Sequence, residues 1–429
     1  MQFCTINLLY ALVLMCGSIV FGAIIAYGSA TLKYIKVDFG PLSTFEIAAF
    51  QSIPALVSIF GPFLFNFMLS KMRRKVVTSI TGCVGCGLWL SLLSMNKNYF
   101  WLAILIRGLH GLILSGVSLI CPLYIIELSP EDSRGLFGSL HPIAIALGHV
   151  IYNLIGVTHQ WEHPIYASAA FMLIFGTCVW FIPDSPSDPK KKEKEEEGED
   201  EDIKIKKESV FEKKYRKDFI VAMILMFSVQ FSGVGAIMQN CAPLLSEVGL
   251  SFDPGYQACL AVSAQLFTCM VSSLLIDKFG GKKLWIFSSS GTSAMLLLYA
   301  LNVKFSWSKW IPMIVLFGYQ CFFGLGLANV PFYFLSVFFP PHIKSTAMTI
   351  GMSLNWVSAT IVMFFFPYLT EWTGQFGLML ILMGINVSCA LFGVFFLKED
   401  RGVSVVVETD IRLDSIKDGL MDDQGTVDL

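Results

Sequence analysis

Long runs of apolar residues alternate with short polar connections along the whole chain. A helix that spans a bilayer needs about 20 mostly apolar residues. Twelve runs of that kind are present, and they begin near residues 7, 44, 77, 99, 136, 164, 218, 255, 283, 310, 345 and 376. The pattern therefore predicts an all-α polytopic membrane protein with twelve transmembrane helices.

Composition agrees with this pattern. Of the 429 residues, 55% are hydrophobic and 14% are charged, which is far from the composition of a soluble globular domain. We therefore expect the lipid bilayer as the surrounding, and the charge pattern gives no support for binding to nucleic acid. The first six residues carry no charge, so the basic segment that opens a signal peptide is absent, and we interpret the first run as a spanning helix. Most of the 11 cysteines fall inside apolar runs, where we expect reduced core residues.

Positive charges mark one side of the membrane. Lysine and arginine gather in the connections at residues 71–75, 190–217 and 278–283. Cytoplasmic connections carry such an excess, so these three are predicted to be cytoplasmic. With an even number of spans, both termini then lie in the cytoplasm, and we expect the plasma membrane as the location.

A charged segment divides the runs six and six. It mixes lysine with glutamate, which is typical of a solvated connector. We predict an N-terminal six-helix half at residues 1–183, a cytoplasmic linker at 184–217, a C-terminal six-helix half at 218–397 and a cytoplasmic tail at 398–429.

A weak internal repeat relates the two halves. The string LSKMRRKV at residues 69–76 resembles IDKFGGKKL at residues 276–284. Glu127 and Arg134 correspond to Val337 and Lys344, 210 residues later in both cases. Two six-helix halves that are parallel repeats are the architecture of a carrier whose halves rock against each other.

Several motifs resemble those of the sugar porter family of the major facilitator superfamily. PLYIIELSPEDSRG at residues 122–135 is close to the family pattern P-x-Y-x-x-E-x-x-P-x-x-x-R-G. Further matches are Arg107 at the start of the fourth span, VQFSGVGA at 229–236, DKFGGKK at 277–283, the pair Asn355-Trp356 and KEDRG at 398–402. The resemblance implies a facilitative transporter of a hexose or a similar small neutral polyol. From the same resemblance, we expect a protein that is not an enzyme, needs no cofactor and is a monomer.

The chain departs from the family mainly at positions that line the central cavity. Pro142 and Val229 stand where the family has glutamines, Gly235 and Ala359 where it has asparagines, and Phe332 where it has tryptophan. The scaffold is therefore kept better than the pocket. Two alternatives stay open, a nutrient sensor that does not transport and a proton-coupled carrier of another small organic solute.

The remaining polar groups give the candidate substrate contacts. An amide both donates to and accepts from a hydroxyl, which suits a polyol. The candidates are Gln230, Ser232, Gln265, His141, Phe332 and Asn355. Each has a plainer alternative: an interhelical hydrogen bond for the amides, a core position for the histidine and apolar packing for the phenylalanine.

A second set of residues gives candidates for gating. They are Glu127, Arg134, Arg107, Arg73, Asp277 and Lys344. Cytoplasmic ion pairs between the halves would hold the carrier outward-facing, whereas the alternative is capping of the hairpin alone. The acid expected in the second half is Val337, so that side of the network is weakened. We hypothesise that the inward-facing state is more populated than in typical members.

Charge inside the spans bears on coupling. The sequence has no Asp or Glu in the middle of any span, and Ile24 stands where proton-coupled relatives place an aspartate. A proton relay needs a titrating group there, so passive transport is favoured. Arg107 near the outer end of its span either pairs inside the protein or extends outward to water.

One string resembles an enzyme motif. HQWEH at residues 159–163 matches H-x-x-E-H, but it occupies a short outer connection that ends at Pro164, without the helix that zinc chemistry needs. We expect no metal site. No nucleotide-binding loop or nucleophile elbow is present in the sequence, which argues against an enzyme or an ATP-driven pump.

Overall fold

The computed structural model describes residues 2–129, 134–185, 212–246, 251–339 and 341–398. Every regular element in these ranges is a helix, so the predicted all-α class is confirmed. The predicted linker and tail fall largely outside the described residues.

The first half contains six spans, and some of them are built from two elements. Its elements are α1 (Gln2–Phe39), α2 (Thr44–Ser58), α3 (Gly61–Lys71), α4 (Arg74–Ser91), α5 (Phe100–Glu127), α6 (Arg134–Gly156) and α7 (His163–Cys178), with the 3-10 turns η1 (Leu92–Ser94), η2 (Lys97–Tyr99) and η4 (Val179–Phe181). Helices α2 and α3 follow each other along one span, which starts with a capping box between Ser43 and Glu46.

The second half contains the other six spans. Its elements are α9 (Arg216–Phe231), α10 (Val234–Gln239), α11 (Cys241–Ser246), α12 (Pro254–Phe279), α13 (Gly281–Phe305), α14 (Ile311–Leu325), α15 (Val330–Phe338) and α16 (Pro341–Phe396). The last helix carries two spans, because its backbone turns at Gly374 with a φ of 66°. The twelve predicted spans are thus accounted for, starting close to the expected positions.

The seventh span is interrupted at a glycine. Gly233 has a φ of 95°, a conformation that L side chains rarely adopt, and a Cβ there would lie 2.9 Å from the Leu382 side chain. Helix α9 therefore ends before it and α10 starts after it. The break allows the outer part of this span to take a direction different from that of the inner part.

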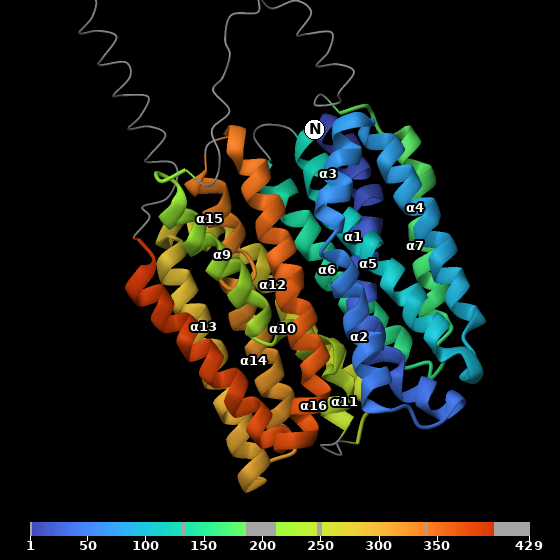
Figure 1. Cartoon of the computed structure of the whole chain (residues 1–429), viewed down its shortest axis with the longest axis vertical. Helices are drawn as coiled ribbons and strands as arrows, with labels where there is room; N and C mark the ends of the chain where they lie inside the picture. The colour runs from blue at the N-terminus through green and yellow to red at the C-terminus, as the bar shows by residue number, and fades with distance from the viewer. Residues whose placement is uncertain (1, 130–133, 186–211, 247–250, 340, 399–429) are drawn as a thin grey trace, which may run out of the picture.

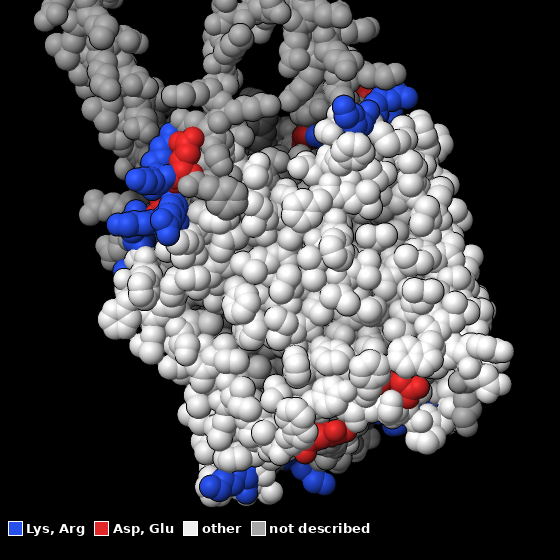
Figure 2. Space-filling model, viewed as in Figure 1, with Lys and Arg blue, Asp and Glu red and all other residues white. Residues whose placement is uncertain are grey.

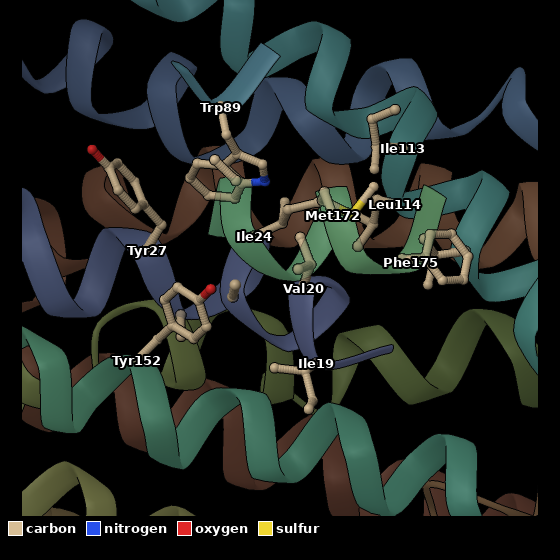
Figure 3. Close-up of a cluster of buried hydrophobic side chains, with 14 of the residues drawn as sticks. Ile19, Val20, Ile24, Tyr27, Trp89, Ile113, Leu114, Tyr152, Met172 and Phe175 are labelled. Atoms are coloured by element: carbon tan, nitrogen blue, oxygen red, sulfur yellow. The ribbon is translucent and has the colours of Figure 1, made fainter. Parts of the chain in front are cut away.

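Close helix crossings hold each half together. At the crossing of α1 with α6, a Cβ on Gly22 would lie 2.2 Å from the Ile145 carbonyl oxygen, and one on Gly148 would lie 2.2 Å from that of Ile19. Only glycine fits there, which is how membrane helices with small residues approach closely. Figure 3 shows Val20 and Ile24 of α1 in one buried cluster with Trp89 of α4 and Met172 of α7.

Charge and apolar surface are separated along the molecule. Figure 2 shows charged side chains near the two ends and a broad band without charge between them. Large apolar side chains are exposed around the spans, including Phe67, Phe267 and Phe395, each more than 60% exposed. A soluble protein would not expose so many, so this band is the surface that faces lipid.

Candidate functional site

Aromatic and imidazole rings meet between the halves at mid-depth. Phe21 of α1 lies 6.1 Å from the His141 ring of α6 and 6.1 Å from the Trp356 ring of α16, between ring centroids. His141 Nδ1 is 2.8 Å from Ser18 Oγ. The indole Nε1–H of Trp356, which is 4% exposed, has no hydrogen-bond partner among the described residues. His141 thus lies beside an aromatic contact that joins the halves.

Two predicted amides form a pair on the other side of this level. Gln230 Nε2 donates to Asn355 Oδ1 at 3.1 Å, and Asn355 Nδ2 donates to the Met226 carbonyl at 2.9 Å. A Cβ on Gly235 would lie 3.1 Å from Gln230 Oε1 and 2.5 Å from the Met363 side chain. The loss of a side chain at position 235 therefore leaves room for the glutamine amide.

The other predicted contacts are less suited to a solute. Ser232 is fully buried, its Oγ donates to the Val229 carbonyl at 2.6 Å, and its own carbonyl accepts from Tyr319 and Asn386. Its hydroxyl and carbonyl therefore hold the break after α9 in place. Gln265 is half-buried, and its Oε1 has no partner among the described residues. Phe332 packs against an apolar cluster of α9, α15 and α16.

At the end of α5 that carries the charged motif, Glu127 pairs with Arg74. Arg74 Nη2 lies 3.1 Å and Nε 3.3 Å from the Glu127 carboxylate, which also accepts from Ser185 Oγ at 2.5 Å. Arg73 precedes the helix and is half exposed, 4.0 Å from Asp184. The first residue inside α4, rather than its N-cap Arg73, therefore turns toward α5.

These ion pairs join elements of one half. Glu127, Arg73 and Arg74 connect α4, α5 and the segment after η4, all in the first half. The Nζ atom of Lys75 lies 3.2 Å from Asp184 Oδ1, also within the first half. The pairs that Glu127, Arg73 and Lys75 form with described residues therefore lie within the first half, and the expected pairing across the halves is not seen among them. The side chains of Arg134, Asp277 and Lys344 lie outside the described part of the chain.

Arg107 is buried near the outer end of α5. It is 1% exposed, its Nη2 donates to the Ile24 carbonyl at 2.9 Å, and its guanidinium lies 5.3 Å from the ring centroids of Tyr27 and Phe50. The alternative in which it extends outward to water is wrong. It also lies at the opposite end of α5 from Glu127, away from the cytoplasmic charges.

Three amides where the halves meet were not predicted from the sequence. Gln51 Nε2 donates to Asn240 Oδ1 at 3.2 Å, and Gln239 Nε2 donates to the Gln51 carbonyl at 3.2 Å. We call Gln51, Gln239 and Asn240 the outer amide set. The signal available in the sequence was the presence of amides inside apolar runs, because such groups need partners in a membrane.

A cavity of about 570 Å³ opens outward from this set. We call it the vestibule, and both halves line it, with Tyr34 and Asn153 on one side and Asn240 and Gln375 on the other. Polar contacts join the halves around it, among them the bond from the Ala242 N–H to Ser29 Oγ at 3.1 Å. Thr44 Oγ1 donates to Glu371, and His159 Nε2 lies 3.8 Å from Asp253 Oδ2. In this structure the halves are therefore joined at the outer end, where α2 and α16 lie side by side in Figure 1.

The H-x-x-E-H string takes part in this joining through His159, whose Nε2 faces Asp253. His159 Nδ1 lies 2.5 Å from Tyr34 OH, and His163 Nδ1 lies 2.8 Å from Thr158 Oγ1. No group of histidine, cysteine or carboxylate side chains in the described ranges has the arrangement of a metal site.

The family model and the relatives described here all indicate sugar transporters. Residues 11–407 match the family model "Sugar (and other) transporter". The facilitated glucose transporter member 2 of Sus scrofa is 26% identical over 404 residues, covering 85% of this chain and 76% of the relative. The sugar transporter ERD6-like 18 of Arabidopsis thaliana is 25% identical over 437 residues, covering 93% of this chain and 89% of the relative.

Solved structures share the fold. A D-xylose-proton symporter superposes with a TM-score of 0.76 at 19% identity, covering 92% of this chain and 98% of the other. The inward open xylose transporter XylE from E. coli gives a TM-score of 0.77 at 18% identity with the same coverage. The twelve-helix major facilitator architecture expected from the repeat is thereby confirmed.

Proposed function

The chain belongs to the sugar (and other) transporter family, and we propose that it carries a hexose or a similar small neutral polyol across the membrane by alternating access. The observation that carries this proposal is the hydrogen-bonded pair of Gln230 and Asn355 at mid-depth. Asn355 precedes Trp356 in α16, and Trp356 contacts Phe21 of the first half. The glucose and sugar transporters among the relatives support the solute class.

The chemistry of the central level suits a hydroxylated solute. The amides of Gln230 and Asn355 donate and accept, as do sugar hydroxyls, and His141 adds a ring nitrogen at the same depth. Trp356 and Phe21 offer apolar faces for the C–H side of a sugar ring. The Trp356 indole N–H has no bond within the described chain and supplies one further donor. No described carboxylate lies at this level, so a neutral solute is favoured over a cation.

Movement of the halves as blocks explains how access alternates. The Arg74–Glu127 pair fixes α4 to α5 in the first half. In the second half, Lys398, which follows α16, lies 3.3 Å from Asp218 of α9. With each half held in this way, the contacts that change are those between the halves. We keep Arg134, Asp277 and Lys344 as predicted members of the cytoplasmic gate.

Passive transport is favoured over proton coupling. The described carboxylates lie near the ends of spans: Glu46 and Glu127 at helix ends, and Glu371 beside the turn of α16 at Gly374. Arg107, which would need an acid to form a relay, is bonded to the backbone of Ile24 instead. A proton relay through the membrane needs a titrating side chain along its path. A carrier of this kind is expected to equilibrate its solute without using a pH gradient.

The placement in the cell follows from charge. The basic connections at residues 71–75 and 278–283 favour a cytoplasmic position for this end, with both termini on the same side. We propose two six-helix halves at 1–183 and 218–397, a monomer, and residence in the plasma membrane.

Uptake of labelled glucose into liposomes that carry the purified protein tests the proposal. Without a pH gradient, the wild type should equilibrate glucose with saturable kinetics. Gln230→Ala should lower Vmax/KM about tenfold, because loss of two hydrogen bonds to the solute costs about 1–3 kcal/mol. The matched control is Gln257→Ala, a buried amide that bonds to the Phe252 carbonyl away from this level. Absence of wild-type uptake from correctly folded protein would contradict the proposal and favour a sensor.

A further inference from the structure

The outer amide set is bonded in an unusual way for side chains buried in a membrane protein. Gln51 is 1% exposed and Gln239 is 3% exposed. Each uses its NH₂ group as a donor, yet the Oε1 atom of each has no partner among the described residues. A buried acceptor without a partner costs about 1–3 kcal/mol. Two such oxygens on neighbouring side chains indicate a place built to receive donors from something else.

Close packing holds these amides at the line where the halves meet. A Cβ on Gly28 of α1 would lie 3.3 Å from Gln51 Nε2 and 3.6 Å from the Gln239 carbonyl oxygen. The absence of a side chain at Gly28 therefore lets α1 lie directly against α2 and α10. Asn240 is anchored by its Nδ2, which donates to the Ala236 carbonyl at 2.8 Å. The positions of the amides are thus fixed by the fold, and only their contacts with one another can be exchanged.

The set lies on the path between the vestibule and the central level. Asn240 lines the vestibule, and so does Ile47, which lies four residues before Gln51 and hence on the same face of α2. On the other side, Gln239 ends α10 and follows Gln230 by nine residues along the same span, across the break at Gly233. A solute that passes from the vestibule to Gln230 therefore meets the amides first.

We infer that Gln51, Gln239 and Asn240 form an outer subsite that binds hydroxyl groups of the solute before it reaches the central level. This inference rests on the proposed function, because it takes the solute to be a polyol. A hydroxyl donates to the free Oε1 atoms and accepts from the amide NH₂ groups. When the outer end opens, the bond between Gln51 and Asn240 is exchanged for bonds to solute hydroxyls, so the number of hydrogen bonds is kept.

Competition by deoxy sugars, combined with substitution of the amides, tests the subsite. In cells that lack other hexose uptake, glucose and its 1-, 2-, 3-, 4- and 6-deoxy analogues are added outside, and their inhibition of labelled glucose entry is compared. The wild type should discriminate against at least one analogue by about three- to tenfold, the value of one neutral hydrogen bond. In Gln51→Met and in Gln239→Met, which keep side-chain length, this discrimination should fall below about twofold.

A matched control separates recognition from packing. Gln257→Met removes another buried amide whose Oε1 is free, but its NH₂ bonds to the Phe252 carbonyl in its own connection. It should keep the wild-type profile of discrimination. A purely structural role of the outer amide set would slow the entry of all analogues alike and leave their ratios unchanged, which would overturn the inference. Equal inhibition by every analogue in the wild type would also overturn it. Failure of the wild type to take up glucose at all would instead remove the proposed function.

Discussion

The two ends of the molecule use polar side chains differently. At the outer end, hydrogen bonds such as that from the Ala242 amide to Ser29 Oγ cross from one half to the other. At the opposite end, for which we propose a cytoplasmic position, the described ion pair of Arg74 with Glu127 stays inside the first half. Cross-half contacts set which side of a carrier is closed, whereas contacts inside a half set its rigidity. A polar contact between the halves therefore affects which conformational state of the carrier is populated, whereas a polar contact inside one half affects the stability of the fold.

Breaking the cytoplasmic pair should have the largest effect. Arg74 and Glu127 are only 11% and 12% exposed in their side chains. Arg74→Leu leaves a buried carboxylate without its main counter-charge and should destabilise the protein by about 3 kcal/mol. Thermal unfolding in detergent should then shift downward by about 3 °C, because an unfolding entropy of about 2.1 cal/mol/K per residue gives about 0.9 kcal/mol/K for the 429 residues.

The neighbouring arginine gives the control for that comparison. Arg73 is 43% exposed and lies 4.0 Å from a half-exposed Asp184. Arg73→Leu should change stability by less than about 0.5 kcal/mol, as is usual for exposed pairs. Equal shifts for the two arginines would contradict the assignment of Glu127 to Arg74.

Removing a buried bond at the outer end should change the state more than the stability. Ser29→Ala leaves the Ala242 N–H without its cross-half acceptor and should cost the outer-closed state about 1.4 kcal/mol, a tenfold change in the equilibrium. Labelling of Ile47→Cys, in the vestibule, by a membrane-impermeant maleimide should therefore become up to tenfold faster. Ser246→Ala is the control, because that hydroxyl also lines the vestibule but bonds to the Pro243 carbonyl in its own helix. Equal rates in both variants would show that the Ser29 contact does not hold the outer end closed.

The exposed contact of the outer end should matter least. His159 is 58% exposed and lies 3.8 Å from Asp253, which also caps α12 by accepting from the Gly255 N–H at 2.7 Å. Asp253→Asn keeps the cap and removes the charge, so labelling at position 47 should rise by no more than about twofold. His159→Gln should have the same effect, and the double variant should add nothing further. A tenfold effect here would place the main closure at the surface instead of at Ser29.

Much of the fold could be predicted because a bilayer imposes strict rules on sequence. Twelve apolar runs of spanning length, separated by polar connections, leave few alternatives to a polytopic helical protein. The motif at residues 122–135 likewise indicated the family to which the family model matching residues 11–407 assigns the chain. These features depend on local composition, which a sequence displays directly.

The site was harder to predict because it depends on which way single side chains turn. Arg73 and Arg74 are neighbours in the sequence, yet only the second lies inside α4 and reaches Glu127. Ser232 matched a family position but is used by bonds within its own half. Gln51 and Asn240 are 189 residues apart, and their pairing follows from how the halves pack. Only tertiary structure supplies that information.

Counterflow of glucose tests whether the protein carries sugar by alternating access. Proteoliposomes are loaded with unlabelled glucose and diluted into a trace of labelled glucose, with no pH gradient across the membrane. A carrier that binds its solute between two alternating halves should concentrate the label inside transiently above its outside level, because unlabelled solute leaving the vesicle returns the site outward. We expect this overshoot, followed by decay until labelled glucose has the same concentration inside and outside the vesicles. A simple rise to equilibrium without overshoot would contradict alternating access, and no entry of label would contradict sugar transport itself.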